Sequence, residues 1–198
     1  MAQASSKRVN APSDLEARRE AIVGSRDPNR TCVTLCGGTG CRVYGSEKVI
    51  DALQAEISRN GIDADVRMTG CHGFCEQGPV LVIQPQGIFY KSVKLEDVPD
   101  IVNETLGQGK IIDRLLYTDP ITNEKIVYEH EVPFYARQTR RLLNLNGLID
   151  PTSIEDYIAI GGYGALAKVL GEMSPEEVIE KVSNAGLRGR GGAGFPPG

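Results

Sequence analysis

Four of the five cysteines in this 198-residue chain fall into two closely spaced pairs, and this spacing limits the available folds more than any other feature. The first pair is Cys36 and Cys41 in the run CGGTGC, and the second is Cys71 and Cys75 in GCHGFCEQGP. Thiolates bind soft metals, and sets of four cysteines hold zinc or iron–sulfur clusters. A fold that uses all four residues must bring two distant loops together.

Three kinds of cysteine site are open on spacing alone: an iron–sulfur cluster, a zinc ion and a redox dithiol. Structural zinc pairs are usually closer in sequence than these pairs are, and a thioredoxin-type dithiol needs a Cys-x-x-Cys motif, which the chain lacks. Glycines beside both pairs allow backbone N–H groups to approach a cluster and its sulfurs. The residues therefore favour a [2Fe–2S] cluster on Cys36, Cys41, Cys71 and Cys75 over zinc or a dithiol.

Two residues near these pairs are expected to have other roles. Cys32 lies in a predicted strand, Thr31 to Leu35, where a small buried thiol is common. His72 follows Cys71 directly, but four thiols already complete a ligand set, and Rieske sites need two histidines. We therefore predict that Cys32 is structural and that His72 is not a metal ligand.

Hydrophobic periodicity predicts a small α/β domain around the cysteines, over residues 30–110. A helix from about Ser46 should bury one face and stop at Asn60-Gly61. Strands, a hairpin around Gln86-Gly87 and a closing helix follow from alternating and apolar runs. The order of strand, helix, strand, hairpin and helix is typical of a thioredoxin-like fold. The buried face of the first helix is expected to comprise Val49, Ile50, Leu53 and Ile57. A strand is expected at 64–68, the two hairpin strands at 80–83 and 88–93, and the closing helix at 101–106.

The flanking regions differ in composition from this domain. Residues 1–29 form an N-terminal extension, with a helix whose capping box opens at Ser13. Residues 111–141 are a connector with turns at Asp119-Pro120 and Asn123. Residues 142–198 are helical, with starts at Asp150-Pro151 and Ser174-Pro175 and a stop at Gly186. We expect 142–198 to be the incomplete opening of a larger domain.

Charge and hydropathy exclude several classes of protein. The net charge of −4 gives no indication of nucleic-acid binding, and no apolar run is long enough for a membrane span or has the form of a signal peptide. We therefore expect a cytoplasmic protein. The cytoplasm is reducing, so its cysteines are better explained as metal ligands than as a disulfide framework.

A glycine-rich loop, Gly189-Arg190-Gly191-Gly192-Ala193-Gly194, is the second informative motif. The loop follows a predicted helix rather than a strand, which disfavours an ordinary Rossmann site. It also lacks the Gly-Lys-Ser/Thr sequence that defines a P-loop. Its backbone can still approach a phosphate or a flavin, Arg188 and Arg190 can offset charge, and Phe195 can stack on a flat ring. The alternative is a flexible linker, which rarely carries two arginines and Phe-Pro-Pro.

Both motifs together resemble one family. The segment GLRGRGGAGFPPG, with IDPTSIEDYIAIGGYGALAKVLGEMSPEEVIEKVSNAG before it, is similar to the NADH-binding flavoprotein subunit of respiratory complex I and of soluble NAD(P)-linked hydrogenases. A thioredoxin-like [2Fe–2S] module ahead of the flavin domain is typical of the hydrogenase-linked members, including electron-bifurcating ones. The stretch GIFYKSVKLEDVPDIV resembles theirs as well.

The resemblance implies a fold, an activity and a set of sites. The fold is a thioredoxin-like [2Fe–2S] domain followed by the helical opening of a flavin- and NADH-binding α/β domain, and the activity is that of an NAD(P)H dehydrogenase or hydrogenase-type oxidoreductase subunit. NADH would reduce FMN, which passes electrons to iron–sulfur clusters. The cluster ligands would be Cys36, Cys41, Cys71 and Cys75, and the residues along the FMN and NAD(H) site would be Gly189, Arg190, Gly191, Gly192, Ala193, Gly194 and Phe195.

Partners and further cofactors follow from the same resemblance. Family members work with other iron–sulfur subunits of a multi-subunit complex and with NAD(P)H, and they carry a [4Fe–4S] cluster whose ligands are absent from this sequence. A competing hypothesis treats residues 30–110 as a ferredoxin-like electron carrier, with C-terminal helices that only dock onto a partner and no flavin chemistry. A zinc-stabilised scaffold is the third.

Overall fold

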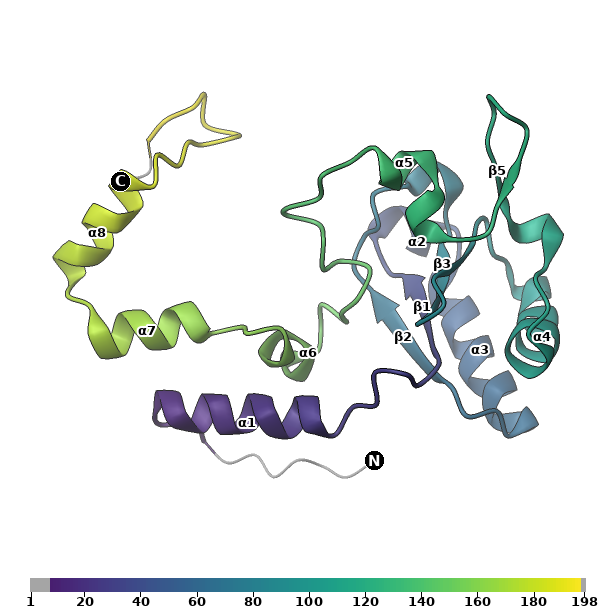
Figure 1. Cartoon of the computed structure of the whole chain (residues 1–198), viewed down its shortest axis with the longest axis horizontal. Helices are drawn as coiled ribbons and strands as arrows, with labels where there is room; N and C mark the ends of the chain where they lie inside the picture. Colours follow the sequence, from purple (N-terminus) through teal and green to yellow (C-terminus); the bar gives the residue numbers. More distant parts are fainter. Residues whose placement is uncertain (1–7, 197–198) are drawn as a thin grey trace. The chain divides into compact units, whose positions relative to one another are not determined.

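The computed structural model describes residues 8–196 and divides the chain into two compact units. The first unit described here, the cysteine unit, runs from Asp27 to Asp156. The second, the terminal unit, combines residues 8–26 with residues 157–196. Figure 1 shows the course of the chain through both units.

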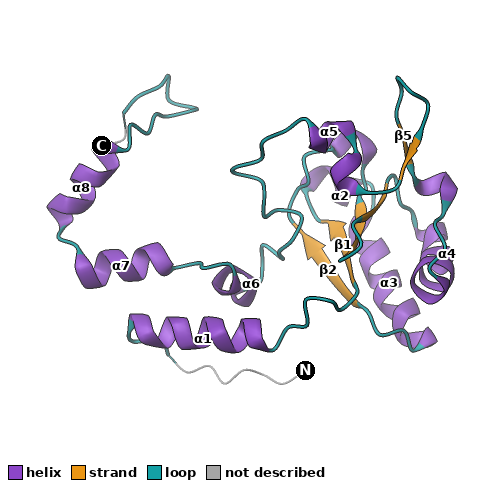
Figure 2. Cartoon of the chain, viewed as in Figure 1, coloured by secondary structure: helices purple, strands orange, loops and turns teal. Residues whose placement is uncertain are grey.

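A four-stranded mixed sheet, whose strands are orange in Figure 2, organises the cysteine unit. The strand order is β2-β1-β3-β4. Strands β1 (Cys32–Cys36) and β2 (Asp65–Thr69) are parallel, while β3 (Leu81–Gln84) and β4 (Ile88–Tyr90) form an antiparallel hairpin beside β1. A parallel pair needs a long crossover, and helix α3 (Ser46–Asn60) supplies it. The two central strands, β1 and β3, are almost entirely buried.

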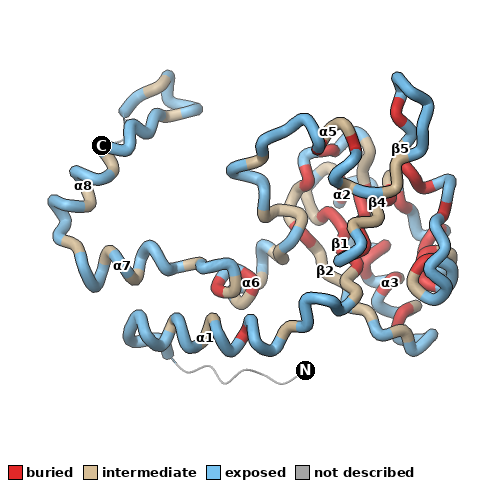
Figure 3. Tube along the Cα trace, viewed as in Figure 1, coloured by how far each residue is buried: buried red, intermediate tan, exposed pale blue. Residues whose placement is uncertain are grey.

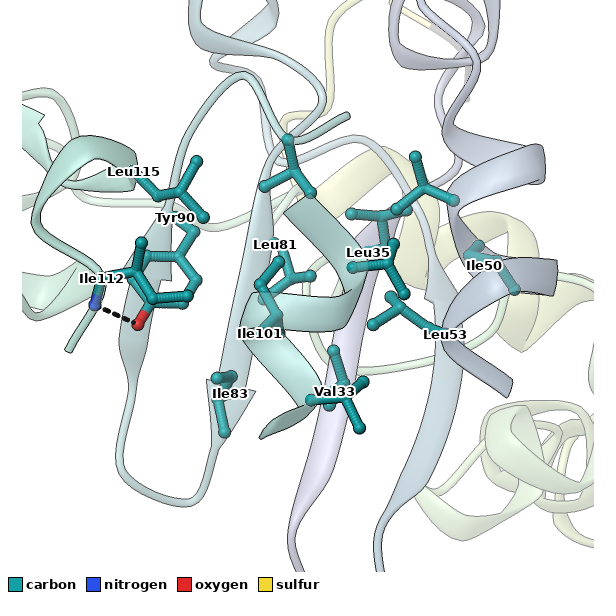
Figure 4. Close-up of a cluster of buried hydrophobic side chains, with 14 of the residues drawn as sticks. Val33, Leu35, Ile50, Leu53, Leu81, Ile83, Tyr90, Ile101, Ile112 and Leu115 are labelled. Carbon is teal, nitrogen blue, oxygen red and sulfur yellow. Dashed lines mark hydrogen bonds between the residues drawn. The ribbon is translucent and has the colours of Figure 1, made fainter. Parts of the chain in front are cut away.

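The main core lies between this sheet and helix α3 (Figures 3 and 4). The predicted helix face is confirmed: Val49, Ile50, Leu53 and Ile57 are all buried. Gly61 ends the helix in the left-handed conformation with φ of 63°, which glycine adopts at little cost. Figure 4 shows Leu53 and Ile50 beside Val33 and Leu35 of β1.

A buried tyrosine ties the segment after the domain to the core. The Tyr90 hydroxyl accepts a hydrogen bond from the Ile112 backbone N–H at 3.0 Å and lies 2.8 Å from Thr105 Oγ1 (Figure 4). Ile112 and Leu115 are buried in the same cluster. Residues 111–116 therefore pack as part of the core rather than as a free connector.

Shorter elements complete the cysteine unit. Asp119 Oδ1 accepts the backbone N–H of Ile121, and Asn123 has φ of 60°, which confirms the two turns predicted between short apolar stretches. The unit includes all of 111–141, the segment predicted as a connector. Its remaining elements are α2 (Thr39–Val43), η1 (Cys75–Gln77), η2 (Leu95–Asp97), α4 (Val98–Asp100), η3 (Ile101–Leu106), η4 (Asp113–Leu115), β5 (Tyr117–Thr118), β6 (Lys125–Ile126), η5 (Glu129–Glu131) and α5 (Pro133–Ala136).

The terminal unit is helical in the residues described. It contains α1 (Pro12–Gly24), α7 (Gly164–Glu172) and α8 (Pro175–Asn184), and α6 (Ile154–Ala159) spans the boundary between the units. The start of α8 is confirmed: Glu177 N–H donates to Ser174 Oγ at 3.2 Å, and Ser174 N–H donates back to Glu177 Oε2 at 2.7 Å. Gly186 follows with φ of 61°, as predicted for the stop.

Two predicted helix starts are wrong. Helix α1 begins at Pro12, one residue before Ser13, because the Asp14 carboxylate accepts the backbone N–H groups of Asn10 and Ala11. Pro151 lies in a turn, and α6 begins later, where Ser153 Oγ accepts the Asp156 N–H at 3.2 Å. No helix within residues 8–196 is long and apolar enough to cross a membrane.

Candidate metal centre

The first cysteine pair lies where β1 ends. Cys36 is the last residue of β1, Cys41 lies in the short helix α2, and both are buried. Backbone bonds fix this end of the strand on both sides: Cys36 N–H donates to the Val80 carbonyl at 3.0 Å and Gly37 N–H to the Thr69 carbonyl at 2.8 Å. Cys36 is therefore positioned by the sheet itself.

The second pair lies on the loop that follows β2. Cys71 is half-buried and Cys75 is exposed, and their sulfur atoms lie 3.9 Å apart. The Gly73 N–H donates to Cys71 Sγ at 3.3 Å, and Gly73 has φ of 90°, a conformation that a residue with a side chain rarely adopts. Glycine at this position lets the loop curl around the sulfur.

Glycines bring the two cysteine loops together. A Cβ atom added at Gly38 would lie 3.0 Å from Cys71 Cβ, and one added at Gly78 would lie 2.7 Å from Cys41 Sγ. A Cβ at Gly40 would lie 3.7 Å from Cys75 Sγ. The two pairs, far apart in sequence, therefore lie close together, and a side chain would be crowded at Gly38 and Gly78.

Backbone N–H groups and a neighbouring thiol stabilise the Cys36 thiolate. A hydrogen bond with the Cys41 thiol lowers the pKa of Cys36, and backbone N–H groups of His72 and Gly38 lower it further. The same hydrogen bond, together with burial, raises the pKa of Cys41. Burial also raises the pKa of Cys71, and the hydrogen bond from the Gly73 N–H partly offsets this rise. N–H groups therefore point at the cysteine sulfurs from both loops.

His72 and Cys32 lie beside the site in other roles. The His72 ring is buried, with Nε2 2.9 Å from Thr69 Oγ1 and Nδ1 3.2 Å from Glu129 Oε1, so oxygens engage both ring nitrogens. Cys32 is half-buried at the other end of β1, and burial raises the pKa of its thiol.

A segment after the predicted domain covers the second cysteine loop, and sequence reasoning did not find it. Phe134 stacks on Phe74, with ring centroids 4.2 Å apart and planes 6° apart. Asn146 Nδ2 donates to the Cys71 carbonyl at 3.2 Å. A second buried cluster joins the two segments: Cys36, Cys41, Phe74, Val80, Val82, Phe89, Val132 and Tyr135. In the sequence, the adjacent aromatic residues Phe134 and Tyr135 were the one indication that this segment packs against the domain.

The residues present fit a cluster with two metal atoms. The thiols form two pairs, each of which can serve one iron of a cluster. The glycine backbone around the pairs leaves space for close approach, and its N–H groups suit negatively charged sulfur.

The glycine loop forms a closed turn in the terminal unit. Gly189 N–H donates to the Phe195 carbonyl at 2.9 Å, and Gly194 N–H donates back to the Gly189 carbonyl at 3.1 Å. The Phe195 ring is exposed, and a Cβ added at Gly191 or Gly192 would meet open space. As predicted, the loop follows a helix, α8. It presents backbone and one aromatic ring on its surface.

Comparison with known proteins assigns the family. The model of the thioredoxin-like [2Fe–2S] ferredoxin family matches residues 24–106. A 2Fe–2S ferredoxin of Aquifex aeolicus is 35% identical over 79 residues, which are 38% of this chain and 71% of the ferredoxin. The chain belongs to the thioredoxin-like [2Fe–2S] ferredoxin family. The predicted thioredoxin-like α/β fold around the cysteines is thereby confirmed.

Two longer relatives confirm the resemblance to subunits of hydrogenases and NADH dehydrogenases. The NADP-reducing hydrogenase subunit HndC of Solidesulfovibrio fructosivorans is 65% identical over 52 residues, 26% of this chain and 10% of that subunit. An NADH-quinone oxidoreductase subunit of Rhizobium meliloti is 58% identical over 45 residues, 23% of this chain and 11% of that relative. The chain therefore spans about a tenth of the length of these two relatives and resembles oxidoreductase subunits in the matched part.

Proposed function

We propose that Cys36, Cys41, Cys71 and Cys75 ligate a [2Fe–2S] cluster and that the cysteine unit transfers electrons. The observation that carries the proposal is the meeting of two thiol pairs across glycine backbone, in a chain that belongs to the [2Fe–2S] ferredoxin family. The cluster supplies the ability to accept and release one electron. The protein's own groups position the sulfurs and stabilise their negative charge.

The strand ends and the N–H groups have separate tasks in this proposal. The end of β1 holds Cys36 in place, and the covered loop after β2 holds Cys71 and Cys75. Backbone N–H groups of Gly38, His72 and Gly73 donate to sulfurs, which favours the form with more negative charge. The buried pair lies on the inner side of the site, while the exposed Cys75 marks the side from which an electron can enter or leave.

The wider role proposed is that of an NAD(P)H dehydrogenase or hydrogenase-type oxidoreductase subunit in the cytoplasm. Electrons would pass between NAD(P)H, FMN and the cluster, and other iron–sulfur subunits of the complex would be the partners. This role is supported by the names of the two longer relatives, a hydrogenase subunit and a quinone oxidoreductase subunit. The glycine loop supports it through its exposed backbone and the exposed Phe195 ring.

The cysteine assignment is tested by four single Cys→Ser variants, with Cys32→Ser as the matched control. Each of the four ligand variants is expected to lose iron and acid-labile sulfide after anaerobic purification, because a serine oxygen is a poor ligand for a soft site. Cys32→Ser should keep the wild-type content, since Cys32 lies at the opposite end of β1 from Cys36. Full iron and sulfide in Cys71→Ala, which has no side-chain ligand atom at all, would remove that residue from the ligand set.

The part of the site proposed for FMN and NAD(H) comprises Gly189, Arg190, Gly191, Gly192, Ala193, Gly194 and Phe195. NMR titration of the full chain with FMN and with NADH should move the amide signals of these residues. Gly191→Val should abolish these changes in the amide signals. A Cβ added at Gly191 has no other protein atom within 4 Å, so the valine side chain would obstruct a ligand without disturbing the protein. Gly24→Val, also in open space, is the control.

The alternative function is a ferredoxin-like carrier whose helices only dock. It is favoured by the family match, which covers residues 24–106 and stops before the glycine loop. The NMR titration separates the two functions. Unmoved loop signals at millimolar FMN and NADH would favour the carrier, whereas moved signals that Gly191→Val removes would favour the oxidoreductase subunit.

A further inference from the structure

One buried polar atom near the cysteines has no partner in the protein. Within residues 8–196, the buried side-chain nitrogen and oxygen atoms without a hydrogen bond are Ser46 Oγ and Tyr135 Oη. Tyr135 is 7% exposed. A buried hydroxyl without a partner destabilises the folded protein, so native proteins rarely keep one without a function.

The ring of Tyr135 is surrounded mainly by other aromatic rings, with Glu129 and Arg140 as charged neighbours. Its ring makes edge contacts with Phe74, Phe89 and Phe134, at centroid distances of 5.9, 5.8 and 5.1 Å. Cys36 and Cys41 belong to the same buried cluster. Phenylalanine rings offer the hydroxyl no strong acceptor, whereas the cysteine sulfurs of this cluster can accept a hydrogen bond.

Tyr135 is held firmly in this position. Its N–H donates to the Val132 carbonyl at 2.8 Å, and Val132 is fully buried. The Arg140 guanidinium lies over the ring, 5.4 Å from its centroid, and makes a cation–π contact with it. The hydroxyl is therefore held within the buried cluster that also contains Cys36 and Cys41.

We propose that the Tyr135 hydroxyl donates a hydrogen bond to a sulfur atom of the [2Fe–2S] cluster and raises the cluster's reduction potential. The inference rests on the proposed cluster assignment. Reduction adds negative charge to the cluster, and a donor to its sulfurs stabilises the reduced form more than the oxidised form. Tyr135 lies outside the residues that match the ferredoxin family, so the segment after that domain contributes this donor.

The test compares Tyr135→Phe with the wild-type full chain. The substitution removes only the hydroxyl and keeps the ring contacts. The equilibrium constant for one-electron reduction should fall about tenfold, which is a shift of about 59 mV to more negative potential. Tyr128→Phe is the matched control, because its ring is 41% exposed and its hydroxyl can reach solvent; it should leave the potential unchanged.

A second measurement separates a cluster contact from a structural effect. In the metal-free protein, Tyr135→Phe should unfold no earlier than the wild type, because it removes an unpartnered hydroxyl. An earlier transition would show that the hydroxyl has a partner within the protein and would overturn the inference. A variant that folds normally but loses its cluster, while Tyr128→Phe keeps it, would support the contact.

The outcomes also distinguish this inference from the proposed function. A wild-type chain that takes up no iron and sulfide would overturn the cluster assignment and the Tyr135 inference together. A fully loaded Tyr135→Phe variant with the wild-type potential would overturn the Tyr135 inference alone. Iron and sulfide content is therefore measured on every sample before its potential.

Discussion

The cysteine unit and the terminal unit bury their apolar residues to very different extents. The cysteine unit has a continuous core in which residues such as Val33, Leu53 and Tyr90 are fully buried. In the terminal unit, Leu170 is 78% exposed and Ile179 62% exposed. The cap explains where α8 begins, whereas the cysteine unit has the extensive packing that gives a cooperative fold.

The difference has a functional consequence. A site that must hold sulfurs in fixed positions needs rigid elements behind it, and the sheet and α3 provide them for Cys36. The glycine loop follows a helix with exposed apolar residues and is closed mainly by its own backbone hydrogen bonds. The cysteine site is thus built into a core, whereas the glycine loop is presented on a surface.

The largest expected difference comes from the same substitution placed in each unit. Leu53→Ala should lower the free energy of unfolding of the cysteine unit by about 2–5 kcal/mol, because Leu53 is fully buried. Leu170→Ala should change stability by less than about 0.5 kcal/mol, since that side chain is already exposed. Denaturant unfolding followed by circular dichroism measures both. Equal losses would contradict the contrast between the units.

A smaller effect is expected where the core is polar. Tyr90→Phe removes the acceptor of the Ile112 N–H and a partner of Thr105, both in buried surroundings. It should destabilise the cysteine unit by about 1–3 kcal/mol. Tyr44→Phe, at an exposed tyrosine, is the control in the same unfolding experiment. A neutral Tyr90→Phe would mean that the hydroxyl does not fasten residues 110–116 to the core.

In the terminal unit, the main local contribution to α8 should be its cap. Ser174→Ala removes the side-chain acceptor of the Glu177 N–H and should cost about 1 kcal/mol of local helix stability. Hydrogen exchange of the first-turn amides of α8 should speed up, with no change in the sheet of the cysteine unit. Faster exchange in both places would indicate that the two units unfold together.

The smallest effect concerns pH. Hydrogen bonds from Ser174, first from its backbone, lower the pKa of the Glu177 carboxyl below its value in the unfolded chain. The stabilisation is therefore present above the unfolded pKa of about 4.5 and is lost as the pH falls through the lowered folded value. Hydrogen exchange of α8 between pH 7 and pH 3 checks the direction. Glu177→Gln should remove most of this dependence.

Much of the cysteine unit could be predicted from the sequence because its signals are local. The face of α3, the turn at Gly61 and the hairpin at Gly87 each follow from a few adjacent residues, and each is present. The position of Ser13 misled the prediction because α1 begins earlier, with Ala11 as its N-cap, and the Asp14 carboxylate accepts the Ala11 N–H. Neighbouring polar residues compete for the same N–H groups, and sequence alone does not decide between them.

The contacts that build the candidate site were harder to predict because they join distant segments. Nothing in the sequence near Phe74 indicates that Phe134 will stack on it, or that Asn146 will donate to the Cys71 carbonyl. The cysteine spacing predicted which loops matter, while the close approach of Gly38 to Cys71 and of Gly78 to Cys41 required the fold. The assignment of the four ligands and of the glycine loop stays a prediction.

The most direct test of the central claim is an iron and acid-labile sulfide count on the full chain purified without oxygen, with EPR spectra before and after reduction. The cluster proposed for Cys36, Cys41, Cys71 and Cys75 predicts about two irons and two sulfides per chain and a rhombic signal that appears only on reduction. A protein that binds zinc, or that takes up neither iron nor sulfide under reconstitution, would contradict it.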